Sequence, residues 1–169
     1  MAAWEFQSLN NIAKQHGWHQ FISMQDYHSL LYREEEREMI AYCKDAGVGV
    51  IPYSPLARGL LTRPHKSEPT ERSKTDTYSE LLLGQTTPAD VEIIGRVEEL
   101  AKKKGVSMAA VATAWSIQKG VIPIVGLAST ERVDQAIEAV KLQKEGLLTD
   151  EDVKYLEEKY VAKSVIALG

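Results

Sequence analysis

The sequence predicts an α/β fold built on parallel strands, and three observations point to it. Short apolar runs that suit buried strands alternate with longer segments of helical periodicity. No Asn-Gly or Asp-Gly pair joins two apolar runs, so the sequence has no hairpin signal. Several predicted helices end at a glycine that is soon followed by the next strand. This order is typical of βαβ units, in which the connected strands lie parallel in one sheet.

The first part of the chain contains two predicted helices and two predicted strands. Ala2–His16 has apolar residues close to helical spacing, and Gly17 ends it. Phe21–Gln25 (FISMQ) is short and apolar, which favours a strand. Glu34–Ala46 predicts a helix, since its leading carboxylates suit the positive end of the helix dipole. Val48–Pro52 predicts the second strand.

The rest of the chain begins with a stretch that lacks periodicity. Ser54–Thr87 is rich in proline and polar residues, and we assign residues 62–86 to a long loop. After this loop the sequence predicts two helices, a third strand and two more helices. Their bounds are Pro88–Lys104 and Ser107–Lys119 for the first two helices, Val121–Val125 for the strand, and Ser129–Lys141 and Asp152–Tyr160 for the last two.

We treat residues 1–169 as a single domain. A chain of 169 residues suits one domain, and no linker or internal repeat divides it. Three parallel strands, however, leave two unpaired edges, whereas such a sheet is normally covered on both faces or closed on itself. The pattern therefore indicates a part of a larger barrel or sheet.

Composition excludes several classes of function. The net charge of −4 argues against a nucleic-acid-binding surface, which needs a basic face. No apolar run approaches the roughly 20 residues of a membrane helix, and the N-terminus lacks a secretory signal pattern. The single Cys43 fits a reducing compartment. His16, His19 and His65 show no metal-ligand spacing. We therefore expect a cytoplasmic protein with no metal, nucleic-acid or membrane partner.

Polar residues after the second strand indicate a binding site. In Val48–Leu61 (VGVIPYSPLARGLL), the strand is followed by an aromatic ring, a hydroxyl and a positive charge, from Tyr53, Ser54 and Arg58. Ligands of parallel α/β folds bind at the carboxyl ends of the strands. Gly126–Gln135 (GLASTERVDQ) follows the third strand and enters a helix, whose free N–H groups form an anion site. Together these segments predict one wall of a cofactor pocket.

Two long segments resemble a known family. They are residues 21–63, FISMQDYHSLLYREEEREMIAYCKDAGVGVIPYSPLARGLLTR, and residues 105–140, GVSMAAVATAWSIQKGVIPIVGLASTERVDQAIEAV. Both resemble the aldo-keto reductase superfamily, particularly its fungal, aryl-alcohol-dehydrogenase-like members. The resemblance implies a partial (β/α)₈ TIM barrel, with about three parallel strands and their helices. It also implies that the N-terminal half of the domain is missing from this chain.

The resemblance further implies a function. The family reduces aldehydes and ketones to alcohols with NADP(H), so the complete protein would act on a small-molecule carbonyl substrate. The family's catalytic Asp, Tyr, Lys and His lie upstream of the segment that matches Ala2, and we assign no catalytic residue here. We therefore expect a cofactor-binding wall that is inactive alone. Two alternatives stay open, namely a noncatalytic NADP-binding or regulatory subunit and an inert truncated gene product.

The first cofactor contacts that the resemblance implies follow the first two strands. Gln25 matches the amide that hydrogen-bonds the nicotinamide carboxamide, and an amide supplies both a donor and an acceptor. Tyr53 matches the aromatic residue that stacks on the nicotinamide ring. The turn that wraps the pyrophosphate corresponds to Ser54, Pro55, Leu56, Ala57 and Arg58.

The remaining cofactor contacts lie in the segment that begins at Gly126. Arg132 matches the basic residue that grips the adenosine 2′-phosphate, which favours NADP over NAD. Ser129 would donate to the same phosphate, and capping of the helix is an equally good local explanation. Gln135 lies where the family contacts adenine. Ala136 departs from the Asn that many members have at this position.

Three further features have less specific interpretations. His28 is a candidate for lining the substrate pocket, with a packed or solvent-facing histidine as the alternative. We interpret the run REEERE, residues 33–38, as a solvated helix face. Pro64–Leu83 occupies the place of a family loop that folds over the cofactor, with disorder as the alternative. The open sheet edges predict self-association.

Overall fold

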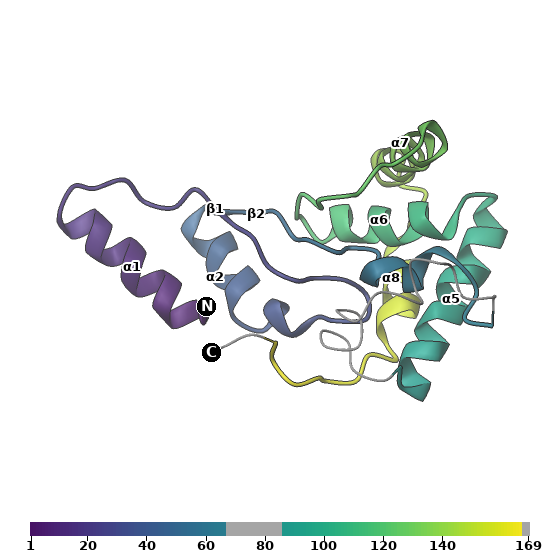
Figure 1. Cartoon of the computed structure of the whole chain (residues 1–169), viewed down its shortest axis with the longest axis horizontal. Coiled ribbons are helices and arrows are strands. Elements are labelled where there is room, and N and C mark those ends of the chain that lie inside the picture. The colour runs from purple at the N-terminus through teal and green to yellow at the C-terminus, as the bar shows by residue number, and fades with distance from the viewer. Residues whose placement is uncertain (67–85, 167–169) are drawn as a thin grey trace.

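The computed structural model describes residues 1–66 and 86–166 (Figure 1). It is a mixed α/β structure with helices and a small parallel sheet, and this confirms the predicted α/β class. The strands are β1 (Ser23–Met24) and β2 (Gly49–Val50), and two short 3₁₀ helices are η1 (Glu34–Glu36) and η2 (Ala57–Thr62). The α-helices are α1 (Ala3–Gln15), α2 (Met39–Ala46), α5 (Pro88–Lys104), α6 (Met108–Gln118), α7 (Thr130–Lys144) and α8 (Asp150–Glu157).

The sheet is parallel, as the sequence predicts, but its strands are shorter than the predicted segments. Ser23 lies opposite Gly49, and the two strands run in the same direction. Pairing continues past the assigned strands, since the Tyr53 N–H donates to the Asp26 carbonyl at 2.8 Å. The carboxyl ends of β1 and β2 therefore lie side by side.

Val121–Val125, predicted as the third strand, is not a strand in the structure. It runs beside β2, and the N–H groups of Ile122 and Ile124 donate to the carbonyls of Val50 (2.9 Å) and Pro52 (2.8 Å). A parallel ladder needs a return bond from the partner strand after each such donation. Proline has no N–H, so Pro52 cannot donate the return bond. The return bond from Pro52 is therefore missing, although the segment keeps its place next to β2.

The predicted helix Glu34–Ala46 is wrong in its first half. Only the short turn η1 forms there, and the α-helix begins at Met39. The acidic run is also not a solvated helix face, because the Glu34 side chain is only 3% exposed. This carboxylate accepts hydrogen bonds from the Tyr160 hydroxyl (2.7 Å) and from the Lys163 N–H (2.8 Å). Contacts with the end of the chain thus override the local helical pattern.

Threonine side chains cap two of the later helices. The side chains of Thr87 and Thr149 each accept a hydrogen bond from the backbone N–H three residues on, in capping boxes that start α5 and α8. Helix α5 has the predicted bounds, whereas α7 extends to Lys144, and α8 begins at Asp150 and ends at Glu157, earlier at each end than the predicted Asp152–Tyr160. In the predicted loop, η2 ends at Thr62, and residues 67–85 lie outside the described residues.

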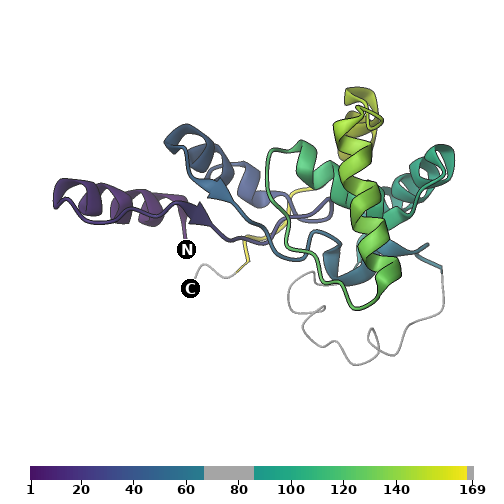
Figure 2. The ribbon, with the colours of Figure 1, turned by 90° about the horizontal axis from the view of Figure 1, so that it is seen from above.

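Two apolar clusters hold these elements together. The larger one joins α5, α6, α7 and α8 to η2, and Trp115 of α6 is fully buried within it. The smaller one packs α2 and Phe6 of α1 against the sheet. Figure 2 shows α1, in purple, projecting from one end of the molecule. In the part of the chain that the structure describes, no helix is long and apolar enough to cross a membrane.

Candidate cofactor-binding site

The predicted site residues follow segments that end at the same edge of the sheet. Gln25 is exposed directly after β1, and Tyr53 is half-buried three residues after β2. The backbone bond from Tyr53 to Asp26 keeps these two ends together, and the bond from Ile124 to Pro52 adds the segment that leads to α7. The carboxyl ends of three parallel segments are therefore adjacent, which is where α/β folds bind ligands.

The Tyr53 ring is positioned by its aromatic neighbours. It packs against the Tyr27 ring, with centroids 5.4 Å apart, and Tyr27 packs against Tyr32 at 5.0 Å. Burial raises the pKa of the Tyr53 hydroxyl, and the nearby charges of Asp26 and Glu35 raise it further. The side chain therefore stays neutral at physiological pH, and it presents a fixed, uncharged ring at the end of β2.

The turn after Tyr53 has an unusual backbone. Ser54, Ala57 and Arg58 have φ values of 54°, 45° and 55°, in the left-handed region that favours glycine. Each such non-glycine residue costs about 1 kcal/mol. Strain of this kind clusters at ligand-binding turns, and here it lies in the segment for which the resemblance implies a contact with the pyrophosphate. Pro55 and Ala57 are buried, while Leu56 and Arg58 are partly exposed.

The last predicted residues surround the start of α7. The Ser129 side chain caps this helix by accepting a hydrogen bond from the Arg132 N–H, so the capping role is confirmed. Gly126, Ser129 and Arg132 are exposed, and Gln135 is partly exposed. Arg132 makes no ion pair with any residue in the described ranges. A helix N-terminus with an exposed guanidinium next to it is suited to bind an anionic group.

Asp26 is a notable residue that sequence reasoning missed. It follows Gln25 directly, is 6% exposed, and neither carboxylate oxygen has a hydrogen-bond partner among the described residues. Burial raises its pKa to about 7, and the neighbouring charge of Glu35 contributes. An acidic residue directly after a short apolar segment that predicts a strand is the signal that could have identified it.

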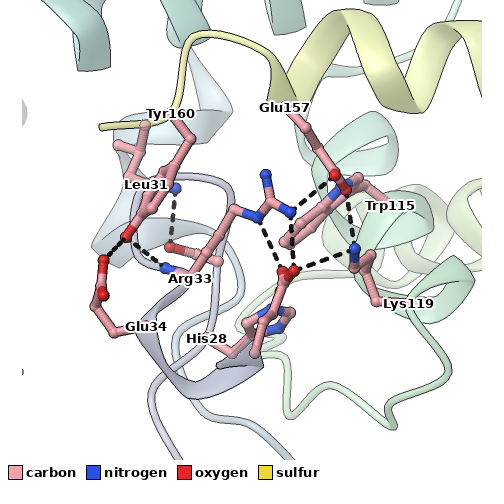
Figure 3. Close-up of polar contacts among 10 residues, drawn as sticks. His28, Leu31, Arg33, Glu34, Trp115, Lys119, Glu157 and Tyr160 are labelled. Carbon is pink, nitrogen blue, oxygen red and sulfur yellow. Dashed lines mark hydrogen bonds and ion pairs between the residues drawn. The ribbon is translucent and has the colours of Figure 1, made fainter. Parts of the chain in front are cut away.

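A cluster of charged side chains connects the segment around Arg33 with α6 and α8 (Figure 3). We name it the Arg33 cluster, and it consists of Arg33, Glu36, Lys119 and Glu157. The Arg33 guanidinium donates two hydrogen bonds to Glu36 (2.9 and 2.8 Å) and one to Glu157 (2.8 Å). The Lys119 ammonium lies 3.2 Å from both carboxylates. The cluster therefore ties η1 to α6 and α8.

Two ring side chains complete the surroundings of this cluster. His28 is fully buried, its Nε2 lies 2.9 Å from the Glu36 carboxylate, and its ring stacks on Trp115 with centroids 5.0 Å apart. The Trp115 indole N–H donates to Glu157 at 2.7 Å. Burial opposes ionisation of Glu36, but the hydrogen bonds from Arg33 and His28 hold its pKa well below its usual range. The alternative interpretation of His28 as a packed residue is thus confirmed, and pocket lining is wrong.

Comparison with known proteins identifies the family. Residues 1–161 match the profile of the aldo/keto reductase family, which is nearly the whole chain. The chain belongs to the aldo-keto reductase family. The resemblance that the sequence carries in the strand ends, the YSPLARG turn and the α7 segment is therefore confirmed at the level of the family.

Among curated proteins, this aldo-keto reductase chain is similar to fungal oxidoreductases. It is 54% identical over 167 residues to a protein of Aspergillus parasiticus named "Versiconal hemiacetal acetate reductase". It is 58% identical over 162 residues to a Schizosaccharomyces pombe protein named "Putative aryl-alcohol dehydrogenase". These alignments cover 98% and 95% of this chain but only 48% and 44% of the relatives. The chain thus spans about half the length of the curated relatives it matches.

Proposed function

We propose that this chain forms the cofactor-binding wall of an NADP(H)-dependent aldo-keto reductase built on a (β/α)₈ barrel. In the complete protein, that enzyme reduces aldehydes or ketones to alcohols. The observation that carries the proposal is the adjacency of Gln25, Tyr53 and the segment leading to Arg132 at the carboxyl ends of parallel segments. Family membership and the names of the reductase and dehydrogenase relatives support it.

The residues present fit the chemistry of NADP(H). When bound, this cofactor supplies the hydride. The Gln25 amide can donate to and accept from a carboxamide, and the Tyr53 ring, held from behind by Tyr27, offers an aromatic surface to a flat ring. Arg132 and the start of α7 supply a guanidinium and free N–H groups, which suit a phosphate. The strained turn that contains Arg58 lies between these two groups in the chain.

Replacing Arg132 with alanine tests the assignment of the 2′-phosphate. We expect NADPH affinity to fall about tenfold, since a lost charge-assisted contact of about 1.4 kcal/mol has this effect, while NADH affinity changes little. Titration of the tryptophan fluorescence with each dinucleotide measures both affinities. Lys144→Ala is the matched control, because Lys144 is an exposed cation in the last turn of the same helix. Equal losses for NADPH and NADH would contradict the assignment.

The purified chain is expected to show no turnover. Carbonyl reduction needs a general acid for the developing alkoxide, and the family's catalytic residues match no position of this chain. The measurement is NADPH consumption in the presence of veratraldehyde, with a full-length family enzyme as the positive control. Measurable consumption by the chain alone would refute the proposal of a cofactor wall without catalytic groups. NADPH binding without turnover also fits a regulatory subunit, whereas no binding at all favours an inert product.

A further inference from the structure

Three tyrosine rings form a column that ends at the candidate site. The Tyr27 ring lies between the other two, with its centroid 5.0 Å from that of Tyr32 and 5.4 Å from that of Tyr53. Both distances are within the range of favourable aromatic pairs. Tyr32 is fully buried and Tyr27 is 3% exposed, whereas Tyr53 is half-buried. We name these three side chains the tyrosine column.

The backbone places the three rings against one another. Tyr27 and Tyr53 pair as a parallel bridge between the segments that follow β1 and β2. Ser29 and Tyr32 exchange two backbone hydrogen bonds of 3.0 Å, and this tight turn brings the Tyr32 ring back to Tyr27. In the described part of the chain, neither Tyr27 nor Tyr32 belongs to the two apolar clusters of the core. The column is therefore a separate connection between the interior and Tyr53.

A distant segment fixes the buried end of the column. The Tyr32 hydroxyl accepts a hydrogen bond of 2.9 Å from the backbone N–H of Ile166. This segment is itself held, because the Lys163 ammonium pairs with the Asp90 carboxylate at 2.8 Å and the Lys163 N–H donates to Glu34 at 2.8 Å. Both carboxylates are buried. A displacement of the Tyr32 ring therefore breaks a hydrogen bond to an anchored segment.

We infer that Tyr32 is a positioning residue for the Tyr53 ring and that it acts through Tyr27. Aromatic pairs are favourable over a limited set of mutual orientations, so each ring of the column restricts the next one. For the cofactor this inference rests on the proposed function, in which the Tyr53 ring faces the nicotinamide. A ring that is already held in one orientation loses less conformational freedom when a flat partner binds to it.

Replacing Tyr32 with leucine tests the inference with two ligands. Leucine is apolar like the ring it replaces, but it removes the ring contact with Tyr27 and the bond from Ile166. We expect NADPH affinity to fall about fivefold, the effect of one lost aromatic pair. The affinity for adenosine 2′,5′-bisphosphate, which has the 2′-phosphate but no nicotinamide, should stay the same. Titration calorimetry measures both affinities. Equal losses for the two ligands would indicate general destabilisation and overturn the inference.

Two variants control for the ring and for its place in the fold. Tyr32→Phe keeps the ring, so it should regain most of the NADPH affinity that Tyr32→Leu loses. Tyr42→Leu also removes an aromatic pair, because the Tyr42 ring lies 6.0 Å from that of Phe6, but this pair is outside the column. This variant should bind NADPH like the parent chain. A Tyr32→Phe variant as weak as Tyr32→Leu, or an equal loss in Tyr42→Leu, would overturn the inference.

Nitration of Tyr53 gives a readout that needs no cofactor. Tetranitromethane nitrates accessible tyrosine rings, and mass spectrometry of peptides identifies the modified position. We expect Tyr53 to be nitrated faster in Tyr32→Leu than in the parent chain, because its ring loses its fixed support, and at the parent rate in Tyr42→Leu. Ile166→Pro removes only the N–H that holds the Tyr32 hydroxyl, and it should raise the rate to a smaller extent.

The outcomes separate this inference from the proposed function. Circular dichroism checks that each variant folds, and Ile166→Pro, which leaves the buried rings intact, provides the test if Tyr32→Leu does not. Unchanged nitration of Tyr53 in the folded variants overturns the inference, whether or not the chain binds NADPH. Faster nitration in variants of a chain that binds no NADPH supports the positioning of Tyr53 and refutes the proposed function instead.

Discussion

Replacing Arg33 with alanine is expected to lower the free energy of unfolding of the chain by about 3 kcal/mol, the size of effect seen when a buried ion pair loses one partner. The Arg33 guanidinium donates to Glu36 and to Glu157, and all three side chains are at most one-fifth exposed. Without it, two carboxylates face each other with Lys119 as their shared cation. Urea unfolding followed by circular dichroism measures the loss.

A matched variant one turn further on separates this effect from the loss of any surface charge. Arg37 is also an arginine and also pairs with a glutamate three residues away, Glu34, but its side chain is 62% exposed. Arg37→Ala should therefore cost less than about 1 kcal/mol. In a double-mutant cycle, Arg33→Ala and Glu36→Gln should be non-additive, because the two groups are in direct contact. Equal losses for the two arginine variants would show that the Arg33 cluster adds nothing beyond surface charge.

Asp26→Asn is expected to abolish a pH dependence of stability. The pKa of Asp26 is about 7 in the folded chain, against about 3.9 for an unfolded aspartate. The folded state therefore binds more protons between these values, and Asp26 makes the chain progressively less stable as the pH rises from about 4 to about 7. Above pH 7 the loss of stability reaches its full size. The difference of about three units between the folded and unfolded pKa of Asp26 sets an upper bound of about 4 kcal/mol on it.

The measurement is the difference in unfolding free energy between Asp26→Asn and the parent chain, taken from urea titrations at pH 4 to 8. The difference should be near zero at pH 4 and should favour the variant increasingly up to pH 7. Other groups that titrate in this range cancel in the comparison. The charged or titratable groups that face Asp26 are Glu35, Cys43 and Tyr53, and of these Glu35 raises its pKa. Glu35→Gln should therefore shift the midpoint to lower pH. A difference that is constant over the whole range would contradict the raised pKa.

Features determined by neighbouring residues were predictable from the sequence. Helix α5 has its predicted bounds, and Ser129 caps α7 as predicted, since a hydroxyl and the N–H three residues on lie within one turn. The parallel pairing of β1 and β2 also follows from a helix that lies between two apolar runs. The site residues are a different case, because the family resemblance rather than any local pattern pointed to Gln25 and Arg132.

Features that depend on distant residues were not predictable. The segment after Arg33 has a helical pattern, but Glu34 is drawn into contacts with Tyr160 and Lys163, more than 120 positions away. No local signal shows that Glu157 will neutralise Arg33 or that Trp115 will cover His28. The prediction of Val121–Val125 as a third strand is wrong for a reason that lies in an adjacent segment. The sequence predicts that Pro52 ends the second strand, but its lack of an N–H also removes a bond to the neighbouring segment.

The left-handed residues at Ser54, Ala57 and Arg58 carry a lesson for protein engineers. Glycine at any of them would relieve a steric clash of the side chain, so a search for thermostabilising substitutions will be drawn to this turn. Under the proposed function, Ser54 and Arg58 of this turn lie against the dinucleotide, whereas Ala57 is buried in the core. Stability and cofactor affinity then compete at single positions. A substitution here that raises thermal stability would weaken cofactor binding.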